Sequence, residues 1–166
     1  MTPENAFDQH HQAVYSFAYR LTRRQDVAED ITQECFLSLI RAPQRFDAAR
    51  GSMKVFLFSI ARNLVLKQYR DDHPGEPLDG VEEQIATDPR GSLEISSAVA
   101  TAVAGLPHLQ QEALILFEYE GVTLDEIARI TGADTGTVKS RLHRARTRLR
   151  RVLAEYRNTG SEHATI

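Results

Sequence analysis

The 166-residue sequence has no tryptophan, a single cysteine and no long run of apolar residues. Cys35 cannot form an internal disulfide by itself, and no Cys or His pair has the spacing of a structural zinc site, so we expect no disulfide and no metal. No apolar stretch approaches the roughly 18 to 20 residues of a membrane-spanning helix. Because 42% of the residues are hydrophobic and 26% are charged, the composition is typical of a globular protein.

Targeting and catalytic motifs are missing as well. The N-terminus has neither a basic start nor an apolar stretch that would mark the chain for export, so we expect it in the cytoplasm. Six histidines are scattered along the chain, and no nucleophile, phosphate-binding loop or cofactor motif accompanies them. We therefore expect a protein that is not an enzyme and that needs no cofactor.

The net charge of −3 conceals an uneven distribution along the chain. Residues 1–70 hold 10 basic and 7 acidic residues, 71–92 hold 1 and 7, and 93–166 hold 9 and 9. Residues 71–92 also contain three prolines and three glycines, which is typical of a flexible linker, although a long surface loop is the alternative. We expect two small domains, 1–70 and 93–157, and a disordered tail at 158–166.

Apolar residues in the first half recur at intervals of three, four and seven, which predicts three amphipathic helices near 7–21, 27–39 and 56–64. Asp26 is placed to cap the second helix and Ser52 the third. No alternating pattern of a strand competes with these helices. The fold class predicted for the chain is therefore all-α, with two small helical domains joined by the flexible acidic linker.

Two polar segments of the first half allow either a binding role or a structural one. Acidic and amide side chains crowd the start of the second predicted helix. They form either a surface for a basic partner or only a solvated face. Residues 41–54 contain four cations, an aromatic ring and one acid, which suits a surface for single-stranded nucleic acid. Phe46 in this segment could instead simply cover the core.

The second half carries the layout of a helix-turn-helix at residues 123–142. Thr123 and Glu126 are spaced as a capping box, Gly132 suits the turn, and Asp134 can cap the second helix. The second helix would enter the major groove of DNA, whereas the alternative is a plain helical hairpin. Its continuation to Arg151 has seven cations and no acid, which favours phosphate binding over a solvated cationic face.

Four motifs in this order resemble the extracytoplasmic-function sigma factors of bacteria. They are Asp-Val-Ala-Glu-Asp-Ile-Thr-Gln-Glu-Cys-Phe-Leu at 26–37, Phe-Leu-Phe-Ser-Ile-Ala-Arg-Asn at 56–63, Leu-Pro at 106–107, and the helix-turn-helix segment from Glu126 to Arg146. The resemblance covers roughly residues 5–155. It implies an initiation subunit that binds core RNA polymerase, reads duplex −35 and single-stranded −10 promoter DNA, and is controlled in trans by an anti-sigma factor.

The resemblance also assigns residues to three surfaces. The polymerase-docking set is Asp26, Glu29, Asp30, Gln33, Glu34 and Phe36. The −10 set is Arg45, Phe46, Arg50, Ser52, Lys54, Phe56, Arg62, Asn63 and Lys67. The −35 set is Thr135, Thr137, Lys139, Ser140, Arg141, His143, Arg144 and Arg148, in which Arg141 and Arg148 are expected on phosphates.

Two positions depart from the family pattern, and one rival interpretation stays open. Phe56 stands where the family usually has tryptophan, and Lys67 stands where it usually has aspartate, so the −10 preference is expected to differ from the family norm. The rival is a dimeric repressor or response-regulator output domain that uses the same helix-turn-helix. It leaves residues 1–70 unexplained, and binding to core polymerase would distinguish the two.

Overall fold

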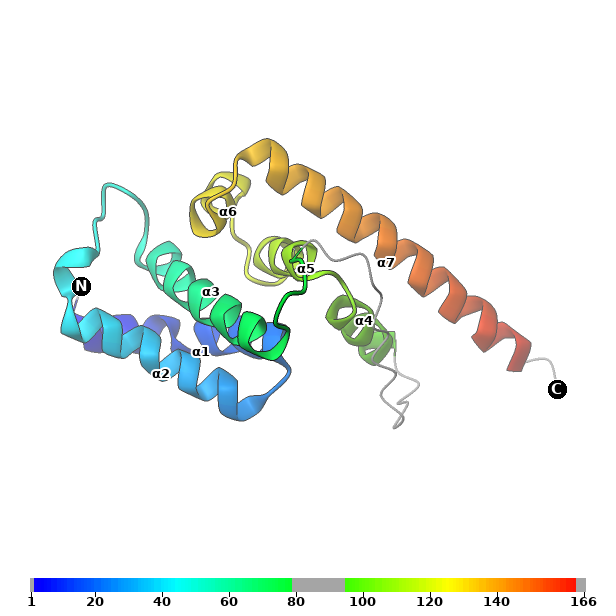
Figure 1. The fold of residues 1–166 in the computed structure, drawn as a ribbon, viewed down its shortest axis with the longest axis horizontal. Coiled ribbons are helices and arrows are strands. Elements are labelled where there is room, and N and C mark those ends of the chain that lie inside the picture. Colours follow the sequence, from blue (N-terminus) through cyan, green and yellow to red (C-terminus); the bar gives the residue numbers. More distant parts are fainter. Residues whose placement is uncertain (1, 79–94, 164–166) are drawn as a thin grey trace.

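A computed structural model describes residues 2–78 and 95–163, and within these ranges the chain forms helices and no strands. The prediction of an all-α, two-domain fold is confirmed (Figure 1). The first domain contains α1 (Pro3–Thr22), α2 (Gln25–Arg41), a short 3₁₀ turn η1 (Pro43–Arg45) and α3 (Met53–Asp72). The second contains α4 (Ile95–Ala104), α5 (His108–Leu114), a π-helical turn η2 (Ile115–Tyr119), α6 (Leu124–Thr131) and α7 (Thr135–His163).

The core of the first domain lies where α1 packs against both α2 and α3. Phe17 of α1 and Phe58 of α3 are fully buried, with their ring centroids 5.2 Å apart. Cys35 of α2 is also fully buried, and burial raises the pKa of its thiol to about 12. The cysteine is therefore a core residue that stays protonated at neutral pH.

The helix starts of the first domain bear out one capping prediction and correct the other. The Val55 amide donates to Ser52 Oγ at 3.2 Å, so Ser52 caps α3 as predicted. The prediction for Asp26 is wrong, because α2 begins at Gln25 and the residue that precedes it, Arg24, makes no side-chain cap. Asp26 lies inside the first turn, 3.5 Å from the Arg24 guanidinium, where its charge still complements the helix dipole.

The helix-turn-helix of the second domain has the local geometry that the sequence predicts. The capping box of α6 is complete, with the Glu126 amide donating to Thr123 Oγ1 and the Thr123 amide donating to Glu126 Oε1. Gly132 has a φ of 71°, a left-handed conformation that glycine adopts without strain. Asp134 Oδ1 accepts a hydrogen bond from the Thr137 amide at 2.7 Å and so caps α7.

The capping box should contribute measurably to the stability of the second domain. Thr123→Ala removes the hydroxyl that satisfies an orphan amide, and we expect the free energy of unfolding to fall by about 1 kcal/mol. Thr123→Ser keeps the hydroxyl and should stay close to the wild type. Chemical denaturation of the three proteins measures both effects, and an alanine variant as stable as the serine variant would contradict the assignment.

Three features, namely α4, the end of α7 and the end of α3, differ from expectation or were not anticipated. The sequence pattern predicts no helix at α4, because its serine, alanine and valine residues show no polar periodicity, but α4 forms and packs against α7. The predicted tail begins at 158, yet α7 continues to His163, because extending an existing helix needs no new nucleation. Residues 164–166 and the predicted linker from residue 79 onward lie outside the described residues, while Asp71 and Asp72 belong to α3.

The two domains are packed against each other. α3 lies along α6, and α1 touches α5 and η2, as the central position of α5 in Figure 1 suggests. The buried apolar residues of both domains form one connected cluster. η2 lies at this contact, where the Glu120 amide donates to the Ile115 carbonyl five residues earlier. The domain boundaries themselves stay a prediction.

Candidate functional site

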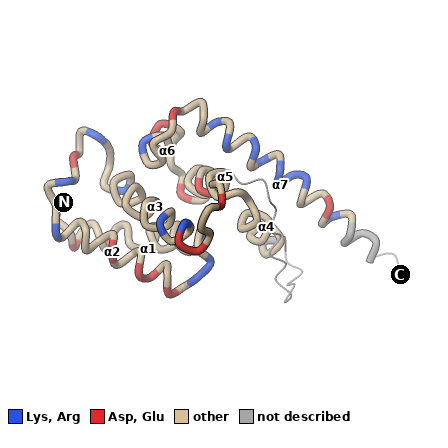
Figure 2. The backbone as a smooth tube through the Cα atoms, viewed as in Figure 1, with Lys and Arg blue, Asp and Glu red and all other residues tan. Residues whose placement is uncertain are grey.

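The first candidate surface is the N-terminal half of α2, where the predicted polymerase-docking residues gather. Their acidic side chains give this helix its red segments in Figure 2. The exposed members are Asp26, Glu29, Asp30 and Gln33. Glu34 is half-buried and accepts a hydrogen bond from Arg41 at 3.0 Å. Phe36 differs, because it is only 5% exposed and its ring packs against Phe7 at 5.0 Å between centroids. Phe36 therefore supports this surface from inside instead of forming part of it.

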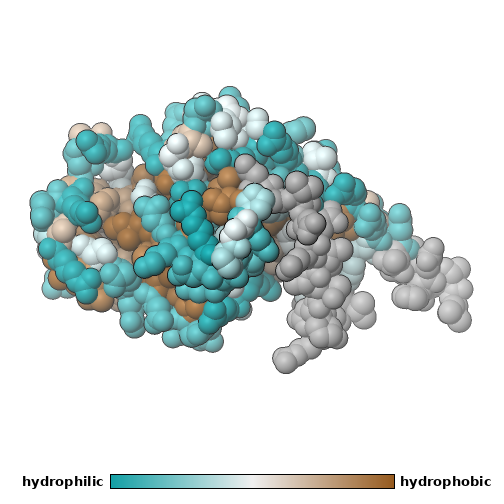
Figure 3. Space-filling view, in the orientation of Figure 1, coloured by the Kyte–Doolittle hydropathy of each residue, from teal (hydrophilic) through white to brown (hydrophobic). Residues whose placement is uncertain are grey.

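Two apolar residues of the same helix were missed by the sequence analysis. Leu37 and Ile40 are 41% and 58% exposed, whereas the other apolar residues of α2 (Val27, Ile31, Cys35, Phe36 and Leu39) are buried. Steps of three and four residues lead from Asp30 through Gln33 to these two positions, so helical spacing alone could have found them. Apolar surface is visible over the N-terminal helices in Figure 3. The docking surface thus continues from acidic into apolar side chains.

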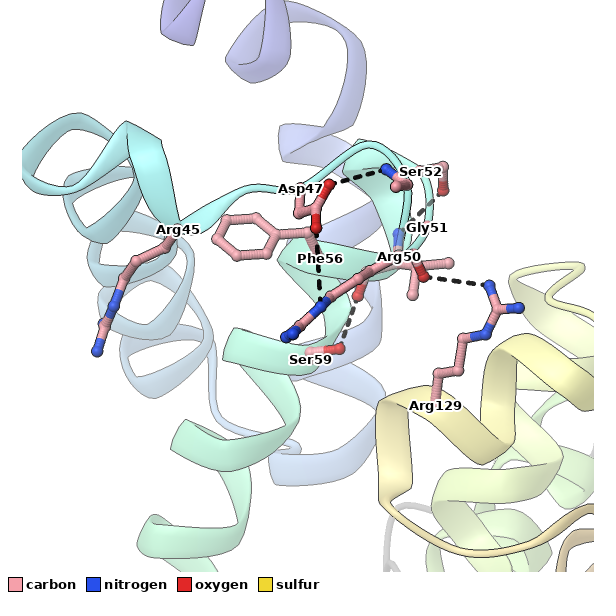
Figure 4. A pocket seen from close by; sticks show the side chains of 10 residues that line it. Arg45, Asp47, Arg50, Gly51, Ser52, Phe56, Ser59 and Arg129 are labelled. Atoms are coloured by element: carbon pink, nitrogen blue, oxygen red, sulfur yellow. Dashed lines mark hydrogen bonds and ion pairs between the residues drawn. The ribbon is translucent and has the colours of Figure 1, made fainter.

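The second candidate site is a cavity of about 600 Å³ formed by the loop after η1, the first turns of α3, and α6 (Figure 4). Its lining comprises Arg45, Asp47, Ala49, Arg50, Gly51, Ser52, Val55, Phe56, Ser59 and Arg129. Four of the nine predicted −10 residues are in this set. Phe46 is half-buried beside Phe56, with the two ring centroids 5.6 Å apart in an edge-on arrangement.

The rest of the cavity wall could not be inferred from the sequence motifs. Asp47 holds the loop, since its carboxylate accepts from the Ala49 amide at 3.0 Å and lies 3.7 Å from Arg50. Arg129 reaches across from α6 and donates to the Arg50 carbonyl at 3.2 Å, as Figure 4 shows. Its place at the cavity depends on how the two domains pack, which no local pattern encodes.

Two other predicted −10 residues lie in the contact between the domains. Arg62 of α3 donates two hydrogen bonds to the Glu112 carboxylate of α5, at 2.9 and 3.0 Å. The Arg62 side chain is 13% exposed and that of Glu112 is fully buried. Lys54 Nζ donates to the Glu120 carbonyl at 2.7 Å. The last two members of the −10 set, Asn63 and Lys67, are exposed on α3.

A buried histidine adjoins this ion pair. His108 packs against the Tyr69 ring of α3 at 4.7 Å between centroids, and its Nε2 lies 3.7 Å from Glu112. Burial, reinforced by the nearby charge of Arg62, lowers the pKa of His108 to about 4. Burial raises the pKa of Glu112, while the hydrogen bonds from Arg62 act in the opposite direction. The histidine is therefore neutral in the folded protein at neutral pH.

The lowered pKa of His108 predicts a loss of stability in acid. Between about pH 6.5 and 4 the unfolded chain binds a proton at this residue that the folded chain does not, so the free energy of unfolding falls as the pH drops through that window. His108→Phe keeps a ring against Tyr69 but cannot titrate. Relative to this variant, the wild type should lose up to about 3 kcal/mol across the window.

Urea denaturation at a series of pH values measures this difference. Groups that titrate in both proteins and do not contact His108 contribute equally to each curve and cancel in the comparison. Parallel curves for the two proteins would show that His108 does not have the lowered pKa.

The third candidate surface is the first half of α7, where blue segments recur in Figure 2. Four members of the −35 set are exposed, namely Lys139, Ser140, His143 and Arg144. The other four, Thr135, Thr137, Arg141 and Arg148, are half-buried. Arg146 is engaged within the domain, since it donates to Glu118 at 2.8 Å and its guanidinium lies 5.3 Å from the Phe117 ring centroid. α7 therefore presents a basic face, part of which is exposed and part of which is held by contacts within the domain.

Residues 2–78 and 95–163 contain neither a candidate metal cluster nor a helix suited to cross a membrane. No three His, Cys, Asp or Glu side chains there are grouped so that they could hold a metal ion. None of the helices described is both long enough and apolar enough to cross a bilayer.

Two family profiles match the two domains separately. The Sigma-70 region 2 profile matches residues 6–73, which cover α1 to α3 and the loop cavity. The Sigma-70 region 4 profile matches residues 96–149, which cover the helix-turn-helix and the basic face of α7.

Solved structures support the same assignment. The sigma factor RpoE from Bartonella quintana, solved in complex with the anti-sigma factor NepR, has 30% sequence identity and a TM-score of 0.71, over 91% of this chain and 96% of that one. CnrH, solved with the cytosolic domain of CnrY, has a TM-score of 0.71 at 22% identity, which supports the fold alone.

Three curated relatives are described as ECF RNA polymerase sigma factors. The chain is 33% identical to the ECF RNA polymerase sigma factor SigE of Mycolicibacterium smegmatis over 94% of its own length, and it spans 63% of that relative. It is 36% identical to SigM of Mycobacterium tuberculosis, over 93% of this chain and 80% of the relative. With SigW of Bacillus subtilis the identity is 32%, over 86% and 83%. The chain therefore belongs to the ECF RNA polymerase sigma factors.

Proposed function

We propose that this sigma factor binds core RNA polymerase through α2 and directs initiation at promoters through the loop cavity and α7. The observation that carries the proposal is that the helix-turn-helix occurs together with the first domain, which has an acidic and apolar face on α2 and supplies most of the wall of the loop cavity. A repressor would need only the helix-turn-helix. On this proposal the chain acts in the cytoplasm beside the polymerase and catalyses no reaction itself.

The docking face of α2 suits a partner that is basic and partly apolar. Asp30 and Glu34 supply carboxylates on adjacent turns, and Leu37 and Ile40 supply exposed apolar area next to them. Apolar burial gives such an interface affinity, while charge complementarity fixes its register and its partner. We assign this face to the polymerase.

The loop cavity suits a single unstacked base of the −10 strand. Pulling a base from the stack costs a few kcal/mol, so the pocket must be preformed and phosphates must be held nearby. Ser52 and Ser59 offer hydroxyls, Phe56 offers a ring, and Arg45 and Arg50 offer cations at the cavity. Asn63 and Lys67 would continue the contact along α3.

The N-terminal half of α7 suits the major groove of the −35 duplex. A recognition helix reads base edges with exposed side chains near its N-terminus, while flanking cations hold phosphates. Lys139 and His143 are one helical turn apart and both exposed, so they can reach neighbouring bases. Arg141 and Arg148 are assigned to phosphates.

Regulation by a protein partner follows from the relatives. RpoE, which this chain resembles over nearly its whole length, is solved in complex with an anti-sigma factor. We propose that an anti-sigma factor likewise holds this chain inactive. Such a complex would bury more than about 1,000 Å² in total.

Co-purification with core polymerase followed by run-off transcription tests the proposed function. We expect a stoichiometric complex with core polymerase and transcripts that begin at defined promoters only when the sigma factor is added. A chain that binds duplex DNA alone and does not associate with core polymerase would instead support the repressor interpretation.

A further inference from the structure

The face of α3 assigned to the −10 strand is in contact with the chain's own second domain. Lys54 and Arg62, both in the −10 set, make hydrogen bonds to Glu120 and Glu112. Arg129 of α6 is bound to the Arg50 carbonyl at the edge of the loop cavity. In this arrangement the second domain occupies groups that the proposed function assigns to DNA.

The Arg62–Glu112 pair resembles a DNA contact in its chemistry. A carboxylate that accepts two parallel hydrogen bonds from one guanidinium uses the same donor fork that an arginine offers to a phosphate. Arg62 is 13% exposed when Glu112 holds it, so it cannot hold a phosphate at the same time. The two acceptors therefore exclude each other.

The buried position of Glu112 favours an all-or-none contact. Removing Arg62 while the Glu112 carboxylate stays buried would be strongly destabilising. When the domains separate, however, water can reach the face of α5 that Arg62 now covers, so the penalty falls. Other contacts break at the same step, because the Arg20 guanidinium lies 4.2 Å from the Tyr119 ring centroid and Tyr69 packs on His108.

We propose that Glu112 is an intramolecular competitor of the −10 phosphate backbone, and that it holds the free sigma factor in a closed, autoinhibited form. This inference rests on the proposed function of α3. Polymerase binding or promoter capture must then break the Arg62–Glu112 pair before Arg62 meets DNA.

The closed form can be measured without any DNA or polymerase. Donor and acceptor dyes are attached at Gln12→Cys in α1 and Thr147→Cys in α7, which are both exposed, while Cys35 is buried and does not compete for the label. Energy transfer in the full chain then reports the separation of the domains. We expect Glu112→Gln to lower the transfer efficiency relative to the parent chain.

Glu118→Gln is the matched control. Glu118 also pairs with an arginine, Arg146, but both residues lie in the second domain. The substitution changes the net charge by the same amount and should leave the transfer efficiency unchanged. Thermal unfolding of both variants checks that each remains folded.

A second arm measures competition with nucleic acid. A fluorescent oligothymidylate strand serves as the probe, because contacts to the phosphate backbone tolerate any sequence. We expect Glu112→Gln to bind it about threefold or more tightly than the wild type, since the closed fraction no longer reduces the apparent affinity. Glu118→Gln, with the same charge change, should bind it like the wild type.

The outcomes separate this inference from the proposed function. Unchanged energy transfer in Glu112→Gln would overturn the closed form, and lowered transfer without tighter strand binding would overturn the competition. If Glu118→Gln had the same effects as Glu112→Gln, the changes in energy transfer and strand affinity would come from the net charge alone. That result would also overturn the inference. None of these results affects run-off transcription by the wild type, on which the proposed function is judged.

Discussion

Reversing the charges of Asp30 and Glu34 should abolish the association with core polymerase. Both carboxylates lie on the exposed face of α2, one turn apart, beside Leu37 and Ile40. Replacement by lysine removes two attractions and adds two repulsions with a basic partner, which together cost several kcal/mol. We expect the affinity of the double variant for core polymerase to fall by roughly 100-fold or more. Transcription should fall at every promoter alike.

The double reversal needs a control with the same change in net charge. Asp71→Lys combined with Glu76→Lys alters two exposed acids outside α2 and should leave core binding intact. Glu34 pairs with Arg41, so the Glu34→Lys change could also act by repelling Arg41. Asp30→Lys alone tests the docking face without this effect. Affinity measured by fluorescence anisotropy tests all three variants. Core binding that survives the double reversal would disprove the assignment of α2.

The residues that recognise the −35 sequence should differ from those that hold the DNA backbone. We expect Lys139→Ala and His143→Ala to leave core binding unchanged but to alter the preference among −35 sequences. A contact to a base edge carries about 1 to 3 kcal/mol of discrimination, whereas phosphate contacts carry little sequence information. Loss of one such contact should therefore change relative promoter strength by about 5- to 150-fold.

Arg148→Ala provides the contrast. As a phosphate contact, Arg148 should contribute equally to all sequences, so its loss weakens binding uniformly and reduces the salt slope by about one unit. Transcription from a panel of −35 variants, together with DNA binding at several salt concentrations, distinguishes the two classes. If Lys139→Ala and His143→Ala depress every −35 variant equally, neither residue reads bases.

Local features of the fold could be predicted because their causes lie within a few residues. The Thr123–Glu126 box, the left-handed Gly132 and the Ser52 cap each depend on short-range hydrogen bonds or backbone sterics. Apolar spacing located α1, α2 and α3 for the same reason. The error at Asp26 has a short-range cause too, since an acid is favourable both as a cap and inside the first turn.

The remaining features depend on contacts between distant segments. The family resemblance places Phe36 on the docking face, but α1 covers it with Phe7. It identifies neither Glu112 nor Arg129, because their roles arise only when α5 and α6 meet α3 and its preceding loop. Arg62 was found from the family pattern, yet the pattern does not indicate that the second domain holds it.

The π-helical turn η2 has a consequence for how this chain can change in evolution. A π turn holds one residue more than an α turn, so η2 is equivalent to a single-residue insertion in the helix that begins with α5. Deleting that residue would restore α-helical spacing and rotate the following chain by about 100°. Tyr119 and the Glu120 carbonyl would then leave Arg20 and Lys54, whereas α6 and α7 would keep their internal geometry. The gain or loss of one codon can thus change how the helix-turn-helix packs against the first domain while α6 and α7 themselves stay intact.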